Sequence, residues 1–407
     1  MAIPKLRFKD FGEDWTAKKL SQVANLTSSK RVHLSDYVSE GIPFFRGKEI
    51  TELKSGIFPK DILYISKKQY EDFKEKFGAP QNNEILMTAV GTLANTYLIN
   101  TDFEFYFKDG NLIWFKDINA DPNFLMILLD ARKNDVLASA IGSTQKALTI
   151  ANLNKLIFNF PSNEEQIKIT SFLSAVDEKI SQLTQKHQLL SQYKQGMMQK
   201  LFSQQIRFKA DDGSEFEKWE DKPLSELSEK AMYGMNASAT EYDGLNKYLR
   251  ITDICEISHK LKRDNLTSPN AELEEKYKLG YGDLLFARTG ASVGKSYLYS
   301  VDDGIAYFAG FLIKFSLKLD LVNPYFLFAQ TLTLDFDKWV ITNSMRSGQP
   351  GINAEEYSSY IFKVPCLEEQ TKIANFLSAI DQKIEVVAQQ IEQAKQWKKG
   401  LLQQMFV

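Results

Sequence analysis

Two segments of the chain repeat apolar residues at alternating spacings of four and three, a pattern typical of helices that bury one continuous stripe. The segments cover residues 161–204 and 365–407. A proline opens each segment, and the Glu-Glu pair that follows suits the positive end of a helix dipole. The pattern predicts two helices of about 39 residues, each roughly 58 Å long. The two stripes contain Ile169, Leu173, Val176, Ile180, Leu183, His187, Leu190, Lys194, Met197 and Leu201, and then Ile373, Leu377, Ile380, Ile384, Val387, Ile391, Ala394, Lys398, Leu401 and Met405.

The two segments are copies of one another. Residues 161–202 align without a gap to residues 365–406 at an offset of 204, and 19 of the 42 aligned positions are identical. Weaker pairs share the offset, such as Trp15 with Trp219. The chain is therefore one unit written twice. We expect a first variable domain over 1–160, a first helix over 161–204, a second variable domain over 205–364 and a second helix over 365–407.

The variable domains alternate strand-like and helix-like stretches. Runs over 83–90, 112–115, 283–286 and 311–315 are apolar and rich in β-branched or aromatic residues, which favours strands. Runs over 122–130 and 324–330 begin with proline in a first helical turn. The sequence thus predicts a mixed α/β (α+β) fold class for both domains.

The first predicted helix leads out of the first variable domain, and the second begins where the second domain ends. Two apolar stripes in one chain would most simply pack antiparallel against each other, related by a pseudo-twofold axis. The two variable domains would then lie at opposite ends of the helical pair. A coiled coil formed between two copies of the chain is the alternative.

This organisation resembles the DNA specificity subunits of type I restriction–modification systems. The resemblance covers essentially the whole chain and rests first on the Pro-x-x-Glu-Glu-Gln-x-Lys-Ile…Phe-Leu-Ser-Ala-Val/Ile-Asp-x-Lys-Ile motifs that begin at Pro161 and Pro365. It also rests on Gly142–Leu148 and Ser347–Asn353, and on the lead-ins Pro4–Phe8 and Gln205–Phe208.

The resemblance implies that each variable domain is a target recognition domain that reads one half of a bipartite, asymmetric double-stranded DNA site. It implies that the helices set the gap between the half-sites and dock two modification (methyltransferase) subunits, which restriction subunits then join. S-adenosylmethionine and ATP would belong to those partners, so no cofactor is expected in this chain. The chain itself would be a non-catalytic, cytoplasmic subunit.

Charge and cysteine content agree with a cytoplasmic protein that works with partners. The net charge is −2, so the chain alone should hold DNA weakly, because neutralised phosphates dominate non-specific affinity. Cys255 and Cys366 are the two cysteines, which suits a reducing compartment. No apolar run is long enough for a membrane span, and the N-terminal stretch lacks the apolar core of a signal peptide.

Two motifs resemble catalytic sites. Thr289–Ser296 is similar to a phosphate-binding loop but has three residues where that motif requires four, so a glycine turn after a strand is the favoured interpretation. Asn323–Phe326 is similar to an amino-methyltransferase motif that lacks its second proline, and a capped helix start explains it. The three histidines are scattered, and His187 on the stripe is expected to pack there. A repeat-built methyltransferase or nucleotide-dependent enzyme and a structural coiled-coil adaptor are the alternative functions.

Arginine and glutamine in loops are the residue types that recognise guanine and adenine edges in pairs of hydrogen bonds, and lysine and hydroxyl side chains contact phosphates. Arg46 and Arg250 occupy equivalent repeat positions flanked by apolar residues, so a structural role is the alternative for them. The DNA-binding candidates are Lys30, Arg31, Arg46, Lys48, Ser143, Thr144, Gln145 and Lys146 in the first domain, and Arg250, Arg288, Lys295, Arg346 and Gln349 in the second.

Overall fold

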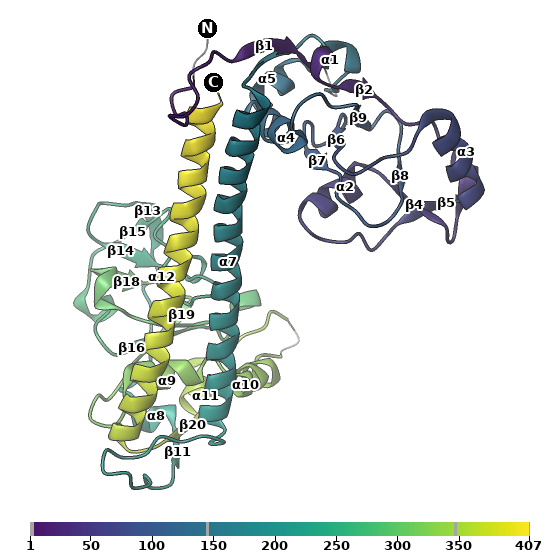
Figure 1. Cartoon of the computed structure of the whole chain (residues 1–407). Coiled ribbons are helices and arrows are strands. Elements are labelled where there is room, and N and C mark those ends of the chain that lie inside the picture. Colours follow the sequence, from purple (N-terminus) through teal and green to yellow (C-terminus); the bar gives the residue numbers. More distant parts are fainter. Residues whose placement is uncertain (1–3, 144–145, 346–347, 407) are drawn as a thin grey trace. The chain divides into compact units, whose positions relative to one another are not determined.

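The computed structural model describes residues 4–143, 146–345 and 348–406, and the chain divides into two compact units. Unit 1 contains residues 1–183 and 389–407, and unit 2 contains residues 184–388. Both divisions fall inside a long helix, because α7 spans Asn163–Phe202 and α12 spans Leu367–Met405 (Figure 1). Each unit therefore holds one α/β domain, one part of α7 and one part of α12.

In unit 1, the beginning of α7 packs antiparallel against the end of α12 (Figure 1). Ile169 and Leu173 of α7 share a buried cluster with Leu401 of α12. At the edge of this seam, the Lys398 ammonium lies 2.6 Å from the Asp177 carboxylate.

Unit 2 repeats this arrangement with the helices exchanged. Leu201, near the end of α7, packs with Ile373 and Leu377 from the beginning of α12. The Lys194 ammonium lies 2.6 Å from the Asp381 carboxylate. Each residue of this ion pair is the repeat equivalent of one in the unit 1 pair, so both units make the same helix–helix contact.

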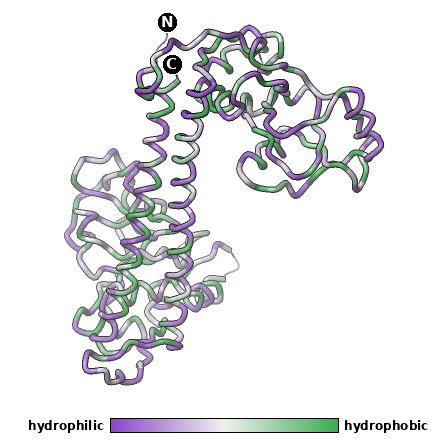
Figure 2. The backbone as a smooth tube through the Cα atoms, in the orientation of Figure 1, coloured by the Kyte–Doolittle hydropathy of each residue, from purple (hydrophilic) through white to green (hydrophobic). Residues whose placement is uncertain are grey.

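Every position of the two predicted stripes is buried or half-buried. Polar and apolar stretches alternate along both helices, as expected when one face is covered and the other is exposed (Figure 2). His187 is half-buried on the stripe, as predicted. The prediction of an antiparallel pair within one chain is confirmed in each unit.

The domain of unit 1 contains two four-stranded sheets and a short strand pair. The first sheet has the order β2-β9-β6-β7, the second β3-β5-β4-β8, and β1 pairs with β10. The strands are β1 Thr16–Lys19, β2 Asn25–Thr27, β3 Tyr37–Val38, β4 Ile42–Phe45, β5 Leu63–Ile65, β6 Ile85–Thr88, β7 Thr96–Leu98, β8 Tyr106–Phe107, β9 Leu112–Lys116 and β10 Ile157–Phe160. The helices are α1 Leu20–Val23, α2 Gly47–Lys54, α3 Lys67–Phe77, α4 Pro122–Ala131, α5 Lys133–Ala138 and α6 Ile150–Leu153.

The domain of unit 2 contains the equivalent sheet β12-β19-β16-β17 and three strand pairs, β11-β20, β13-β15 and β14-β18. The strands are β11 Glu220–Pro223, β12 Met232–Tyr233, β13 Ser238–Glu241, β14 Lys247–Leu249, β15 Thr267–Asn270, β16 Asp283–Ala287, β17 Ser296–Leu298, β18 Ala306–Phe308, β19 Leu312–Ser316 and β20 Ile361–Val364. The helices are α8 Leu224–Leu227, α9 Pro324–Gln330, α10 Leu334–Ser344 and α11 Ala354–Ser358.

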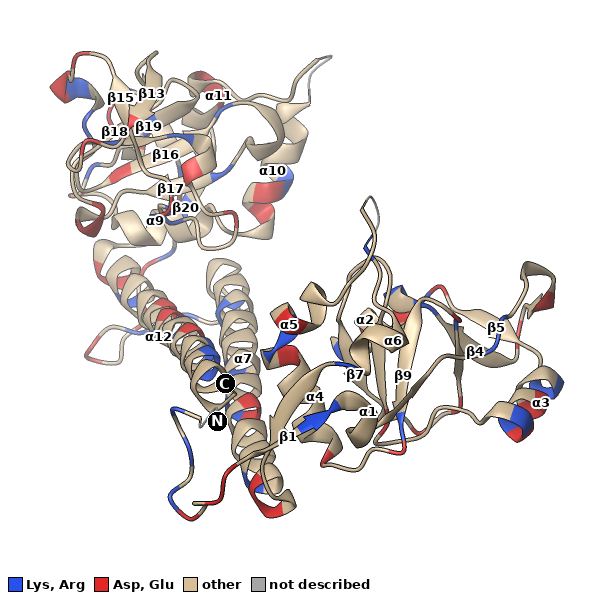
Figure 3. Ribbon diagram, turned by 90° about the horizontal axis from the view of Figure 1, so that it is seen from above, with Lys and Arg blue, Asp and Glu red and all other residues tan. Residues whose placement is uncertain are grey.

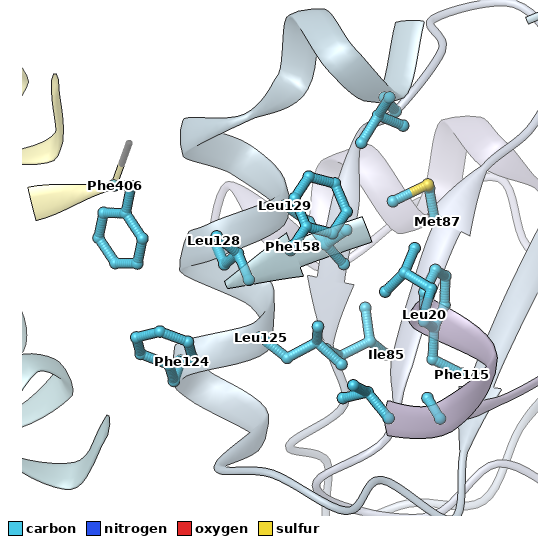
Figure 4. Close-up of a cluster of buried hydrophobic side chains, with 14 of the residues drawn as sticks. Leu20, Ile85, Met87, Phe115, Phe124, Leu125, Leu128, Leu129, Phe158 and Phe406 are labelled. Carbon is cyan, nitrogen blue, oxygen red and sulfur yellow. The ribbon is translucent and has the colours of Figure 1, made fainter. Parts of the chain in front are cut away.

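The central strands β6 and β16 are buried on both faces, which explains their continuous apolar runs. Successive side chains of a strand point to opposite faces, so Ile85 and Met87 enter one core while Leu86 enters another. Figure 4 shows the first of these cores, with Ile85 and Met87 facing the residues of α4. The strands predicted over 83–90, 112–115, 283–286 and 311–315 are confirmed.

Both predicted proline-initiated helices are also confirmed, as α4 and α9, and a side chain caps the beginning of each one. The Asp121 carboxylate accepts a hydrogen bond from the Phe124 amide at 2.7 Å before α4. The Asn323 amide oxygen accepts from the amides of Tyr325 and Phe326 before α9. The motif that is similar to a methyltransferase site is therefore a helix cap.

The repeated Glu-Glu-Gln motif joins each long helix to its own domain. In unit 2, the fully buried Glu369 carboxylate accepts hydrogen bonds from the Arg207 guanidinium and from the Trp219 indole. The neighbouring Gln370 accepts a hydrogen bond from the Asn323 amide at 2.8 Å. Glu165 and Gln166 make the same contacts in unit 1. The motif is near-identical in both copies because it forms this junction twice.

Candidate functional site

Each domain has one place where three backbone segments meet at the end of its central strand. In unit 1, the Ala89 amide after β6 donates to the Asn111 carbonyl at 2.8 Å, and the Leu148 amide donates to the Ala89 carbonyl at 2.9 Å. We call the surroundings the first strand-end site: residues 46–48, 88–92, 111, 141–143 and 146–148. It lies beside the beginning of α2.

Unit 2 has the same hydrogen bonds at the end of β16. The Arg288 amide donates to the Phe311 carbonyl at 3.1 Å, and the Ile352 amide donates to the Arg288 carbonyl at 2.9 Å. We call this the second strand-end site: residues 250, 288–290, 311, 344–345 and 348–352. Arg288 and Phe311 thus occupy the positions of Ala89 and Asn111.

A cavity of about 770 Å³ opens at the first strand-end site. Its lining combines two predicted DNA contacts, Arg46 and Lys48, with hydroxyl side chains and a glycine-containing loop. This combination suits an anionic or polar ligand. The lining residues are Arg46, Gly47, Lys48, Thr51, Glu52, Thr88, Val90, Gly91, Thr92 and Asn111.

Arg46 and Arg250, the repeat-equivalent arginines, are each paired with an acidic residue three positions later. The Arg46 guanidinium bonds to Glu49, whose side chain is 1% exposed, and Arg250 bonds to Asp253 at 2.8 Å. These hydrogen bonds raise the pKa of both arginines. Burial alone would raise the pKa of Glu49, but the hydrogen bonds from Arg46 lower it below its usual value. Both arginines therefore stabilise their loops, and the Arg46 side chain also keeps 37% exposure at the cavity.

The other candidates of the first domain that the structure describes are exposed basic or hydroxyl side chains. Lys48 lies 3.8 Å from Glu52 and is 63% exposed. Ser143 and Lys146 are exposed in the loop of the first strand-end site, while Thr144 and Gln145 lie outside the described residues. A hydrogen-bonded bridge between Ile141 and Ala147 closes this loop.

Lys30 and Arg31 lie on the segment beside residues 106–112. The Lys30 ammonium is 4.4 Å from the centre of the Phe77 ring, and Arg31 makes a largely exposed ion pair of 3.2 Å with Asp109. The structure thus brings Arg46 and Lys48 to the cavity. Ser143 and Lys146 lie on the loop that reaches the end of β6 through Leu148, and Lys30 and Arg31 lie beside residues 106–112.

In the second domain, Arg288 lies close to two aromatic rings. Its guanidinium carbon lies 5.1 Å from the centre of the Tyr233 ring and 5.8 Å from that of Phe311. Gln349 is exposed on the adjoining loop, and Arg346 lies outside the described residues. Sequence reasoning missed Tyr233 and Phe311, because nothing local marks a ring that packs on a residue 55 or 23 positions away.

Lys295 is placed differently from the other candidates. It is 7% exposed, and its ammonium contacts Glu256 and the Ile254 carbonyl. The segment that is similar to a phosphate-binding loop is a turn between β16 and β17, in line with the favoured interpretation. To reach a ligand, the Lys295 ammonium would have to leave its carboxylate partner.

Basic and acidic side chains are interspersed on the molecule. Blue and red stretches alternate along α3 and α12 in Figure 3, which matches the near-neutral net charge. Among the described residues, no group of three or more His, Cys, Asp or Glu side chains could hold a metal ion. None of the described helices combines the length and apolar character that a membrane span requires.

Comparison with known proteins gives one consistent result. A family model described as "Type I restriction modification DNA specificity domain" matches residues 12–192 and again residues 216–396. The type I restriction enzyme MjaVIII specificity subunit of Methanocaldococcus jannaschii is 24% identical over 402 residues and covers 90% of each chain. A Haemophilus influenzae protein named as a type I restriction enzyme specificity subunit is 28% identical over 171 residues, 41% of each chain.

Solved structures share the fold. The S subunit of a type I restriction–modification system from M. genitalium has a TM-score of 0.58 and 18% identity, covering 100% of this chain and 99% of that one. The HsdS subunit from Thermoanaerobacter tengcongensis has a TM-score of 0.50 and 16% identity, covering 97% of each chain. The predicted mixed α/β, twice-repeated architecture is confirmed.

Proposed function

This chain belongs to the type I restriction–modification DNA specificity family, and on that premise we propose that it reads a bipartite, asymmetric DNA site. Each strand-end site would contact one half-site. One observation carries the proposal. The two sites have the same backbone hydrogen bonds but different side chains, with Ala89 and Asn111 in one and Arg288 and Phe311 in the other. Two equivalent surfaces with different chemistry suit two different half-sites, because sequence is read by side chains at base edges.

In this proposal the chain is a non-catalytic, cytoplasmic subunit that works with two modification (methyltransferase) subunits and with restriction subunits. The net charge of −2 supports a need for basic partners on DNA. Leu189 and Tyr193, one turn apart on α7, are each more than half exposed, and exposed apolar side chains of this kind suit a protein contact. S-adenosylmethionine and ATP would be bound by the partners.

The decisive experiment maps methylated bases across the genome of the source cell with and without this gene. We expect one bipartite motif to lose its methylation when the gene is deleted and to regain it when the gene is restored. A methylation map that does not change on deletion contradicts the proposal, as does loss of methylation without any sequence motif.

A second experiment examines the helices as a spacer. Deleting one heptad from α7 and one from α12 should change the length of the unread gap while both half-sites keep their sequences. Altered half-site sequences would contradict the spacer role.

A further inference from the structure

Of the basic side chains that the structure describes in the second strand-end site, Arg288 is the one that no carboxylate neutralises. Arg250, in the same site, pairs with Asp253, and the nearby Lys295 pairs with Glu256. Arg288 has no ion pair with any residue that the structure describes, and its buried Nε has no hydrogen-bond partner there. Since a buried polar group without a partner destabilises the fold, its retention in a site calls for a functional reason.

Two rings hold the guanidinium in place. Tyr233 lies on β12 and Phe311 just before β19, and their ring centres lie 5.1 Å and 5.8 Å from the Arg288 guanidinium carbon. The rings are themselves 40% and 59% exposed, so this cluster faces the surface. Two aromatic rings at this distance restrict the orientation of a guanidinium through cation–π contacts and leave its terminal N–H groups as the available donors.

Gln349 is fixed beside the same loop. The Gly290 amide donates to the Pro350 carbonyl at 3.0 Å, and Gly290 has a positive φ of 77°. A Cβ at Gly290 would lie 3.1 Å from the Gln349 Nε2, so the side-chain amide of Gln349 lies directly over this glycine. An arginine and a glutamine thus emerge from two loops that are hydrogen-bonded together.

Unit 1 lacks this cluster at the equivalent positions. Thr27 pairs with Trp114, the third residue of β9, and Met232 pairs with Lys314, the third residue of β19. Thr27 and Met232 are therefore at equivalent positions in the two sheets. Ser28 therefore corresponds to Tyr233, as Ala89 corresponds to Arg288. The arginine and both rings are specific to the second domain.

We propose that Arg288 is the specificity-determining residue of the second half-site and reads a guanine through its two terminal nitrogens, with Gln349 contacting a neighbouring base. A guanine presents two acceptors in the major groove that match a planar guanidinium held edge-on. Tyr233 and Phe311 act as positioning residues. The inference rests on the proposed DNA-reading function.

The test uses the chain assembled with its modification subunits and, as the probe, a double-stranded DNA library randomised over both half-sites. Methylated molecules are sequenced for the wild type, Arg288→Ala and Arg288→Lys. We expect an unchanged first half-site and a roughly 5- to 150-fold loss of preference for one guanine in the second. Arg288→Lys should lose much of the same preference, because an ammonium cannot form the paired contact.

Arg263→Ala is the matched control, because Arg263 is a 70% exposed arginine of unit 2 outside the strand-end site. It should leave both half-sites unchanged. Circular dichroism checks that the variants fold. If Arg288→Ala does not fold, Arg288→Lys still tests the inference.

Two outcomes overturn the inference. An unaltered second half-site in a folded Arg288→Lys complex excludes base reading by Arg288. Weaker methylation of all sequences with the same half-site preference assigns Arg288 to a phosphate. Failure of the proposed function is distinguishable from both, because the wild-type complex itself would then show no sequence preference.

Discussion

The Arg7 guanidinium lies 2.7 Å from the Glu165 carboxylate, although 158 residues separate the two in sequence. This ion pair ties the N-terminal lead-in to the first turn of α7. Arg207 and Glu369 form the same pair at 2.7 Å in unit 2. In both cases the hydrogen bond to the carboxylate raises the pKa of the arginine. The most similar parts of the two repeats are thus the parts that attach each domain to its helix.

Glu369→Gln should destabilise unit 2 by about 1.5–3 kcal/mol, because the half-buried Arg207 loses its charged partner. Thermal unfolding followed by circular dichroism measures the change. Glu368→Gln is the control, since the exposed Glu368 carboxylate lies 3.8 Å from Lys372 and should contribute within about 0.5 kcal/mol. Equal effects of the two substitutions would refute a special role for the buried carboxylate.

Charge reversal tests the register of the helical pair. Asp177→Lys and Lys398→Asp should each lower the stability of unit 1 by a few tenths to about 1 kcal/mol, and the double reversal should recover most of the loss. Reversing Asp381 should have a larger effect, because it is less exposed than Asp177 and also accepts a hydrogen bond from the Tyr325 hydroxyl. A double reversal that is less stable than both single variants would contradict this register.

Two glycines should respond in opposite directions to alanine. Gly196 lies in α7, and the space that a Cβ would occupy there is open, so Gly196→Ala should raise the free energy of unfolding by roughly 0.5–1 kcal/mol. Gly294 has a φ of 88°, and a Cβ there would lie 2.5 Å from Val340 Cγ1. Gly294→Ala should therefore destabilise unit 2 by about 1–3 kcal/mol. Chemical denaturation measures both, and a shift of the same sign in both variants would contradict the prediction.

His259 should make unit 2 less stable in mild acid. Burial lowers its pKa, and its Nδ1–H donates to the Ser296 carbonyl at 2.9 Å. Below about pH 6.5 the unfolded chain therefore binds a proton that the folded chain excludes, so stability falls with decreasing pH, by at most about 1.4 kcal/mol per pH unit.

His259→Asn keeps a donor and tolerates the positive φ of 54° at this position. We expect the variant to be less stable than the wild type at pH 7.5 and the gap to narrow at pH 5.5, as measured by thermal unfolding. A gap of the same size at both pH values would show that His259 does not titrate in this way.

The sequence by itself determined the features that depend on local periodicity. The spacing of apolar residues defined both long helices and their buried stripes, because one helical face repeats every three to four residues. Continuous apolar runs identified β6 and β16, and Asp121 and Asn323 with their following prolines marked two helix starts. The 204-residue offset revealed the twofold organisation of the chain.

Only the tertiary structure decided which distant residues meet. It placed Arg288 close to the rings of Tyr233 and Phe311, and it buried the Lys295 ammonium against Glu256, although both basic residues stand in similar loop-like sequence. Helix and strand patterns follow from backbone geometry within a few residues, whereas these contacts depend on strand register and on which loops the sheet brings to the same edge. That long-range information is absent from the local pattern of residue types.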